Sequence, residues 1–525
     1  MAGTEGGRSI LDGGVSRARF LKLAGLGAGL SLFPGSVFSA NAAGAQAAGG
    51  PEILNDPKFP IVAWWPPPPV ENVGTKEAQQ ASTDALYAEL ADAGFNTVIG
   101  GNGVSNPRAN RLALAACAAK GLRLVLDDSD LRNAIDPPPP KAARSADQEE
   151  TESAMQALTD QPSRQDVSAR AVADRQAAVT QRIEALKAEL ASRENFPDLS
   201  ALAGILLDDE PGRSLFPILK FAKEEVRRVF GEGELPYVNV WPSHASRDDA
   251  LEAESYTDYL RRYMDRKRYP NAVAPPMLSF DHHPLLLADE RTTPDFFYNH
   301  AVIRNFAQRF GVPSWGFVQS VDFDGQFPAR RRPDEDEIFW QINVALAYGV
   351  KGIQYFTYWT PADTGVRFGT ALIRRTGERT GEKTPLYDSA ARANEILRKV
   401  GRILLPLTSV SVTHFGERRL PRGAKLFRAN NFVKAASGDA AIFGLFGKPN
   451  DATERYLLVV NRSPNKTATT RLTITSTVGS VERFDPSIGE RGEGGFVPET
   501  LTGSPRSFTA AMGVGRAILY RLNTA

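Results

Sequence analysis

Short apolar runs alternate with amphipathic segments from residue 57 to about residue 405. The eight apolar runs are residues 60–66, 95–101, 122–128, 202–211, 235–242, 275–284, 313–321 and 350–359. Each run is continuously apolar, as expected for a strand that helices cover on both faces. The segments with helical periodicity between them include 82–94, 215–231, 293–311 and 333–349, and several end at a glycine before the next run. Eight strand–helix units predict an α/β fold of the (β/α)8 TIM barrel type over residues 57–405.

A doubly wound open sheet is the alternative architecture. The number of units argues against it, and so does the lack of a glycine-rich phosphate loop after the first run. One unit carries an insertion at residues 132–200, which begins with a polar, proline-rich stretch that predicts a surface loop. The stretch from 165 to 194 then has helical spacing. It predicts a long outer helix, with a lid over the barrel mouth as the alternative.

The pattern of apolar and polar residues changes after residue 405. Residues 406–525 contain short runs with a period of two, separated by Gly, Asn, Pro and Asp. This pattern predicts a C-terminal antiparallel β-sandwich domain. Its expected role is to brace the barrel, and carbohydrate binding is the alternative.

The first 42 residues have the features of an export signal. A basic start is followed by a modest apolar stretch and by small residues at Ala40 and Ala42, where cleavage is expected. The segment from Ser16 to Lys22 is similar to a twin-arginine signal, with Ala18 standing where the second arginine belongs. Residues 43–56 then form a linker, and no later run is long enough to span a membrane. We therefore expect an exported bacterial protein, secreted or periplasmic, with no membrane span.

Composition narrows the choice of partners. The chain has 62 basic and 61 acidic residues, so no excess of charge indicates a nucleic-acid partner. Its one cysteine, Cys117, lies among alanines and predicts a thiol buried in a helix. The sequence carries no cofactor motif, and it does not indicate an oligomeric state.

The ends of the strands indicate the chemistry, because reactions in such barrels occur at the carboxyl ends of the strands. The side chains expected there are rich in aromatic rings, carboxylates and amides and poor in cations. Sugars pack their C–H faces on aromatic rings and need polar partners for their hydroxyls, whereas phosphates need cations or helix N-termini. A carbohydrate substrate is therefore expected. The predicted substrate-binding residues are Trp64, Trp65, Asp128, Asp209, Asn239, Trp241, His282, His283, Gln319, Tyr358 and Trp359.

The fourth run ends in "GILLDDEP", with three consecutive acids, Asp208 to Glu210. Glycoside hydrolysis needs one carboxylic acid as proton donor and a second carboxyl as nucleophile or base. Crowding acids at one strand end favours the protonated form of one of them. We predict Glu210 as the general acid. The alternative is that all three acids cap the next helix.

Three stretches, "GILLDDEP", "LSFDHHPL" and "ALAYGVKGIQYFTYW", are together similar to bacterial glycosidase-like proteins. The barrel resembles clan A glycoside hydrolases of the β-galactosidase and family 42 type, in which an N-E-P motif after the fourth strand carries the acid/base glutamate. Glu210 matches that glutamate, but Asp209 stands where the family has Asn. The resemblance implies a nucleophilic glutamate at the end of the seventh strand, where this chain has Gln319.

Three interpretations of the second carboxyl follow from that departure. Asp281 supplies it from the sixth strand, Asp322 or Asp324 supplies it from the loop after the seventh, or the protein binds glycan without cleaving it. We favour Asp281 as nucleophile or base, because it ends a strand beside two histidines. A metal-dependent hydrolase that uses Asp281, His282 and His283, together with Asp208 or Asp127, is a further alternative. Adjacent residues of a strand point to opposite faces, which argues against it, and no metal ligand is predicted.

Overall fold

The computed structural model describes residues 50–100, 106–137, 164–192, 198–287, 292–325, 328–363, 366–377, 379–449, 451, 453–489 and 492–525. The predicted export signal lies outside these residues. No helix in the described ranges is both long enough and apolar enough to cross a membrane.

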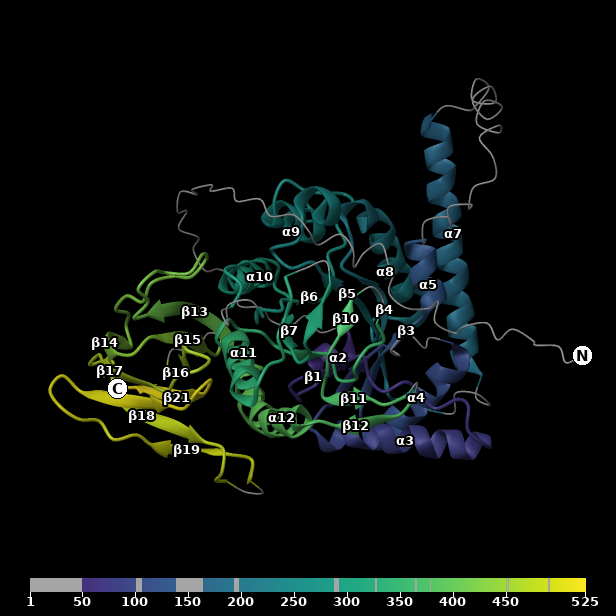
Figure 1. Ribbon diagram of the computed structural model, residues 1–525. Helices are drawn as coiled ribbons and strands as arrows, with labels where there is room; N and C mark the ends of the chain where they lie inside the picture. Colours follow the sequence, from purple (N-terminus) through teal and green to yellow (C-terminus); the bar gives the residue numbers. More distant parts are fainter. Residues whose placement is uncertain are drawn as a thin grey trace, which may run out of the picture.

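Eight parallel strands close into a barrel, which confirms the predicted fold class (Figure 1). In barrel order they are β1 (Ile61–Trp64), β2 (Thr97–Ile99), β3 (Arg123–Asp127), β4 (Leu202–Asp209), β5 (Leu235–Val240), β6 (Leu278–Phe280), β7 (Ser314–Gln319) and β9 (Ile353–Phe356). Every strand falls within one of the eight apolar runs. Short strands decorate the loops after β7 and β9: β8 (Phe323–Asp324) pairs with β10 (Arg367–Phe368), and β11 (Ile373–Arg375) pairs with β12 (Gly381–Lys383).

Helices surround the barrel. They are α2 (Glu52–Asn55), α3 (Lys76–Asp92), α4 (Pro107–Lys120), α5 (Ser129–Ile135), α7 (Arg164–Ala191), α8 (Phe216–Phe230), α9 (Tyr256–Met264), α10 (Phe296–Phe310), α11 (Glu335–Ala347) and α12 (Pro385–Leu404), with short turns η3 (Arg213–Leu215) and η4 (Arg247–Leu251). Cys117 is buried in α4, as predicted, and burial raises the pKa of its thiol.

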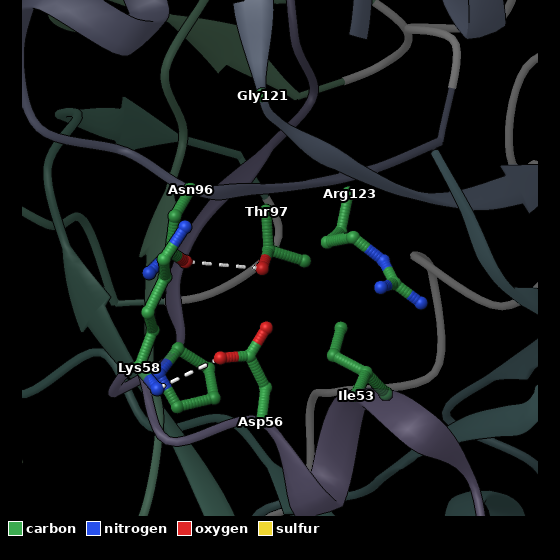
Figure 2. A pocket seen from close by; sticks show the side chains of 8 residues that line it. Ile53, Asp56, Lys58, Asn96, Thr97, Gly121 and Arg123 are labelled. Carbon is green, nitrogen blue, oxygen red and sulfur yellow. Dashed lines mark hydrogen bonds between the residues drawn. The ribbon is translucent and has the colours of Figure 1, made fainter. Parts of the chain in front are cut away.

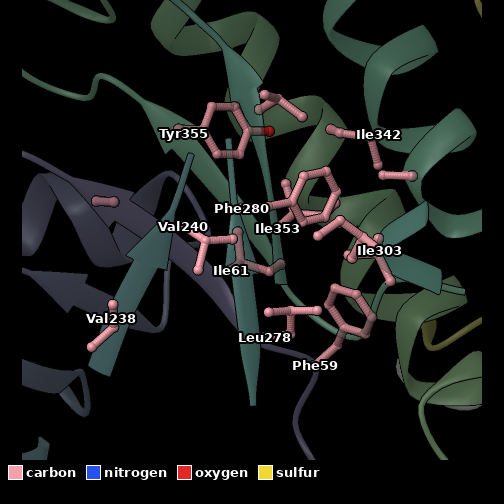
Figure 3. Close-up of a cluster of buried hydrophobic side chains, with 14 of the residues drawn as sticks. Phe59, Ile61, Val238, Val240, Leu278, Phe280, Ile303, Ile342, Ile353 and Tyr355 are labelled. Atoms are coloured by element: carbon pink, nitrogen blue, oxygen red, sulfur yellow. The ribbon is translucent and has the colours of Figure 1, made fainter. Parts of the chain in front are cut away.

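The strands alternate between two apolar cores. Ile61, Leu278, Phe280 and Ile353 point outward into the large core between the strands and the helices (Figure 3). The inward positions fill the barrel with a second core, lined by residues such as Val62, Trp64, Tyr237, Trp315 and Phe317. Because side chains alternate along a strand, membership of these two cores tells which way each strand end points.

The predicted long helix is α7. Its 28 residues span about 42 Å at 1.5 Å per residue, so it extends well past its neighbours (Figure 1). Its second half packs on the body through Val179, Ile183, Leu186 and Leu190, whereas Val172 is exposed. The helix contacts α5 and α8, which makes it part of the outer layer.

The C-terminal strands form two antiparallel sheets, as predicted. One sheet has the order β13 (Thr408–Phe415), β15 (Ala441–Gly447), β16 (Glu454–Asn461), β21 (Ala517–Thr524), β18 (Val478–Asp485) and β19 (Gly495–Pro498). The other has β14 (Val433–Gly438), β17 (Ala468–Ile474) and β20 (Ser507–Met512). An apolar core of its own fills this domain.

Helix α11 joins the two domains, because it contacts β7 on one side and β15 and β16 on the other. Trp340 donates a hydrogen bond to the carbonyl of Arg462 (3.2 Å), and Asn343 donates one to the carbonyl of Gly515 (3.0 Å). The guanidinium of Arg516 stacks on the ring of Phe339 at 3.5 Å. These contacts fasten the C-terminal domain to the barrel through α11.

Candidate active site

A bulge at the end of β4 decides which of the three acids faces the barrel interior. Leu206 pairs with Tyr237, but the next pair is Asp208 with Val238, so one residue of β4 is skipped. Val238 belongs to the outer core, and Asp208 therefore points outward with it. Asp209 is in register with Asn239 and points into the barrel.

The floor of the site is a layer of hydrogen-bonded polar side chains inside the barrel. Asn239 donates to Asp209 (3.1 Å), and Ser279 donates to Asn239 (2.9 Å). Tyr237 lies 2.7 Å from Ser279 and donates to Gln354 (2.7 Å), which in turn donates to Ser279 (2.9 Å). Sequence analysis missed three of these residues, Tyr237, Ser279 and Gln354, because each lies within an otherwise apolar run.

Asp281 lies one step above this floor. It follows Ser279 by two residues and so continues the inward-facing side of β6. Its Oδ2 is 3.5 Å from Nε2 of His283, while its Oδ1 is buried and has no hydrogen-bond partner among the described residues. Burial raises the pKa of Tyr237 far above its ordinary value, and the nearby carboxylates of Asp209 and Asp281 raise it further. Both acids therefore approach the same hydroxyl group.

Glu210 follows β4 directly and has a left-handed backbone conformation, with φ of 57°. This is uncommon for a residue other than glycine and costs about 1–3 kcal/mol, which the surrounding structure must supply. Its amide donates to the carbonyl of Asn239 (2.8 Å), which holds the turn in place. Its side chain is partly exposed. Glu210 thus stands at the barrel end beside the inward-facing Asp209.

Arg132 lies among the acids at this edge. Arg132 of α5 donates to both carboxylate oxygens of Asp127, at 2.6 and 3.2 Å. Burial lowers the pKa of Arg132, but the carboxylates of Asp127, Asp208 and Asp209 outweigh burial and raise it. Sequence analysis missed this arginine, because it lies on a helix rather than at a strand end.

An aromatic wall adjoins Asp281. The ring of His283 lies 4.4 Å from that of Phe356, and the half-buried Trp65 packs on Phe356 and Phe368 at 5.9 and 6.0 Å. Trp65 and His283 were predicted to contact substrate, and the structure brings them to this wall. Phe356 and Phe368 were not predicted. Their signal was weak, since Phe356 lies within a strand and Phe368 in a distant loop.

Four other aromatic residues of the predicted set are buried in the two cores. Trp64 fills the barrel interior against Tyr237 and Phe317. Trp241, Tyr358 and Trp359 are at most 2% exposed and belong to the outer core. They support the barrel rather than line its mouth, which corrects the prediction.

Asp128 and His282 are also engaged elsewhere. Asp128 accepts a hydrogen bond from the amide of Leu131 as the N-cap of α5, and Arg182 of α7 donates to both its carboxylate oxygens. His282 follows Asp281 and points outward, where its ring packs on Phe296 of α10. Burial lowers the pKa of His282 well below its ordinary value. Neither residue faces the mouth, which again corrects the prediction.

Gln319 is fully buried, and its side-chain amide is committed to the chain around it. Its Oε1 accepts from the amide of Leu285 (3.0 Å), and its Nε2 donates to the carbonyls of Arg331 (2.6 Å) and Val321 (3.4 Å). The loops that contain Leu285 and Arg331 are thereby tied to the end of β7. Gln319 is a structural amide, not a reader of sugar hydroxyls as predicted.

The two alternative acids after β7 have structural partners. Asp322 accepts from the amide of Thr370 (2.9 Å) and lies directly over Gly369. Asp324 is half-exposed and forms an ion pair with Arg367 (2.6 Å). These contacts hold the loop after β9, so Asp281 is the better candidate for a second carboxyl.

A cavity of about 160 Å³ lies at the other end of the barrel (Figure 2). Asn96 and Thr97 line it at the start of β2, with Arg123 at the start of β3. Asn96 is already used by the backbone of Phe59 and Ile61. This end of such barrels serves stability, and the cavity is not the candidate site. Among the described residues, no three His, Cys, Asp or Glu side chains are grouped to hold a metal ion.

Comparison with solved structures supports the fold. The chain matches a catalytic mutant of a GH42 β-galactosidase from G. stearothermophilus with a TM-score of 0.50 and 9% identity, over 90% of this chain and 99% of the other. It also matches a family 51 α-L-arabinofuranosidase from Bifidobacterium longum, with a TM-score of 0.42 and 9% identity, over 92% of this chain and 98% of the other. A β-galactosidase from Marinomonas ef1 matches with a TM-score of 0.40 and 10% identity, over 66% of this chain. The match spans 62% of the Marinomonas chain. No family model and no curated protein matches the sequence.

The chain therefore has the barrel fold of a GH42 β-galactosidase. This agrees with the resemblance that the three sequence motifs indicated. At 9% identity the likeness concerns the fold, and the chemistry has to be argued from the site itself.

Proposed function

We propose that this protein is a glycoside hydrolase that cleaves an O-glycosidic bond of a poly- or oligosaccharide with two carboxyl groups. Glu210 is the general acid, and Asp281 is the nucleophile or base. The observation that carries the proposal is the buried Oδ1 of Asp281, which has no hydrogen-bond partner among the described residues and belongs to an inward-facing carboxyl. A buried carboxylate oxygen without a partner is costly unless a ligand uses it.

The aromatic wall suits the same substrate. Trp65 is partly exposed and packs on Phe356, which contacts His283 beside Asp281, and sugar C–H faces stack on such rings. His283 lies within reach of Asp281 and orients its carboxylate (3.5 Å). A separation of the two carboxyls of about 5–5.5 Å produces retention of anomeric configuration, and about 6.5–9.5 Å produces inversion.

The test is sugar release from a panel of plant and bacterial polysaccharides. Glu210→Gln and Asp281→Asn should abolish release while the protein still folds, and Glu254→Gln, at an exposed glutamate, should not change it. Asp324→Asn should also leave activity unchanged. The anomer formed first, followed by NMR, distinguishes retention from inversion. If Asp281→Asn keeps full activity, the assignment of the second carboxyl is wrong.

A catalytically silent glycan-binding barrel is the second candidate, and Gln319 favours it. The resembled enzymes carry their nucleophile at this position, whereas here the amide is fully used by the backbone. Binding of a glycan without any release of sugar, unchanged by Glu210→Gln, would establish this alternative.

Export is part of the proposal. Residues 1–42 read as a signal that directs the protein out of the cytoplasm. Expression in a bacterial host, followed by fractionation and N-terminal sequencing, should give a mature chain that begins after Ala42. Recovery of the uncleaved chain in the cytoplasm would contradict it.

A further inference from the structure

The polar floor of the barrel contains five short contacts among five residues. They join Asp209 to Asn239 (3.1 Å), Asn239 to Ser279 (2.9 Å), Ser279 to Tyr237 (2.7 Å), Ser279 to Gln354 (2.9 Å) and Tyr237 to Gln354 (2.7 Å). All members except Asp209 are at most 2% exposed. Each contact has the length of a hydrogen bond and therefore needs one proton between its two heavy atoms.

Four of the five residues supply only four protons to these contacts. The Tyr237 and Ser279 hydroxyls carry one proton each. The Asn239 and Gln354 amides each point their nitrogen at one contact and their oxygen at another, so each supplies one proton. Exchanging the nitrogen and oxygen of either amide leaves this count unchanged. With Tyr237 donating to Gln354 and Ser279 donating to Asn239, no proton remains for the 2.7 Å contact between Tyr237 and Ser279.

A proton on Asp209 completes the set. Asp209 then donates to the oxygen of Asn239, once the amide of Asn239 is turned by exchanging its nitrogen and oxygen. The nitrogens of Asn239 and Gln354 donate to Ser279, Ser279 donates to Tyr237, and Tyr237 donates to Gln354. All five contacts then hold one proton each. We infer that Asp209 is a neutral carboxylic acid in the folded protein at neutral pH, with its proton held by the floor of the barrel.

The charges around Asp209 are compatible with this state. Asp208 and Glu210 flank it in sequence, and Asp281, which directly follows β6, approaches Tyr237 as Asp209 does. Among the described residues, Arg132 of α5 faces it, and this guanidinium forms a two-oxygen pair with the neighbouring carboxylate of Asp127. Like charges around a carboxyl favour its protonated form.

A neutral Asp209 gives the site a definite charge pattern. It leaves Asp281 as the inward-facing carboxylate and presents an uncharged polar group to the substrate beside Glu210. This step rests on the proposed function, since it makes Asp209 a residue that binds a sugar hydroxyl without adding a second negative charge. The state of protonation itself does not depend on that function.

Infrared difference spectroscopy tests the protonation directly, on the folded protein without substrate. At pH 7 the wild type should show the C=O stretch of a protonated carboxylic acid, which Asp209→Asn removes. Tyr237→Phe removes two of the five contacts. The three that remain need three protons, which Asn239, Ser279 and Gln354 supply, so Asp209 can be ionised in this variant. The band should therefore disappear from Tyr237→Phe at pH 7 and return only on acidification.

Two further variants keep the test decisive. Ser279→Ala deletes three contacts and should also abolish the band at pH 7, should the tyrosine variant fail to fold. Tyr263→Phe is the matched control, because its buried hydroxyl has no partner in the described chain, and it should keep the band. A wild type without the band at pH 7, or Tyr237→Phe and Ser279→Ala variants that retain it, would overturn the inference.

Activity separates this inference from the proposed function. If the enzyme cleaves a glycan, Asp209→Asn, which keeps an uncharged hydrogen-bonding group at this position, should lose less activity than Asp209→Ala. Asp209→Ala should lose about 10²-fold, as for removal of one binding group in a site. An infrared band that behaves as expected in a protein without activity would refute the hydrolase proposal and leave the protonation standing.

Discussion

Replacing Gln319 by Glu puts the carboxyl of the resembled enzymes at the end of β7, and we expect it to destabilise the barrel without creating a nucleophile. The amide nitrogen now donates to two carbonyls, those of Arg331 and Val321. A carboxylate there would have an oxygen facing those two carbonyl oxygens. The residue is fully buried, so water cannot relieve the repulsion.

The expected loss can be estimated from its parts. Two lost hydrogen bonds are worth about 1 kcal/mol each. Experiments in which one partner of a buried ion pair is removed show that a buried charge without a partner costs about 3–5 kcal/mol. We take this range as the total cost, with the lost hydrogen bonds included. We therefore expect Gln319→Glu to lower the free energy of unfolding by about 3–5 kcal/mol at pH 7.5.

The loss should depend on pH. Burial and the facing carbonyls favour the neutral form, so the new carboxyl has a higher pKa in the folded state than the unfolded value of about 4.3. The unfolded state then binds fewer protons than the folded state above that value, and stability falls as the pH rises. Below about pH 4 the acid is neutral, can donate to the carbonyl of Arg331, and the loss should largely vanish.

The assay is urea unfolding of the mature protein at pH 7.5 and pH 4. Melting temperature is a poor readout here, because a chain of 525 residues shifts by only about 1 °C per kcal/mol. Gln181→Glu, at an exposed position of α7, is the control for the added charge. A stable Gln319→Glu at pH 7.5, or one that gains glycosidase activity, would refute the reasoning.

Three further changes test the supporting structure. Arg182→Met should lower stability by about 3–5 kcal/mol in urea, because it leaves Asp128 charged and buried, and adding Asp128→Asn should restore most of the loss. Burial lowers the pKa of Lys351 to about 7, so between about pH 7 and pH 10 the unfolded state binds more protons than the folded state. As the pH rises through this range, the free energy of unfolding of the wild type should therefore increase relative to that of Lys351→Met. A difference between the two proteins that does not change with pH would contradict this. Gly515→Ala should loosen the C-terminal domain, seen as faster proteolysis between the domains, because φ is 65° there and a Cβ would overlap the carbonyl of Asp336; an unchanged cleavage rate would count against it.

The barrel was predictable because its strands are buried on both faces. Each of the eight continuous apolar runs contains one barrel strand, from β1 (Ile61–Trp64) to β9 (Ile353–Phe356). Strand edges were less predictable, since each run extends past its strand into a loop. The small paired strands β8 with β10 and β11 with β12 have no apolar period and were not predicted.

The site was only partly predictable, because contacts between distant segments decide which strand ends remain open. Trp359 is a strand-end tryptophan by sequence, but Gly381 of β12 lies directly against its ring and the residue is buried. Gln319 is likewise covered through Leu285 and Arg331, which lie 34 residues before and 12 residues after it. In both cases the burying residues come from distant segments, and the residues next to the strand in sequence do not indicate them.

Whether a side chain at a strand end points into the barrel depends on which of the two alternating faces of the strand it lies on. The sequence carries a signal for this. On β5 and β6, Tyr237 and Asn239, and Ser279 and Asp281, are polar residues two apart within apolar runs. Residues two positions apart in a strand lie on the same face, so the two polar residues of each pair both point inward or both point outward. On β4 the bulge shifts this phase by one residue, and counting from Leu206 assigns the wrong aspartate to the interior. The ends of β5 and β6 could therefore have been oriented by parity alone, whereas the acidic end of β4 needed the register.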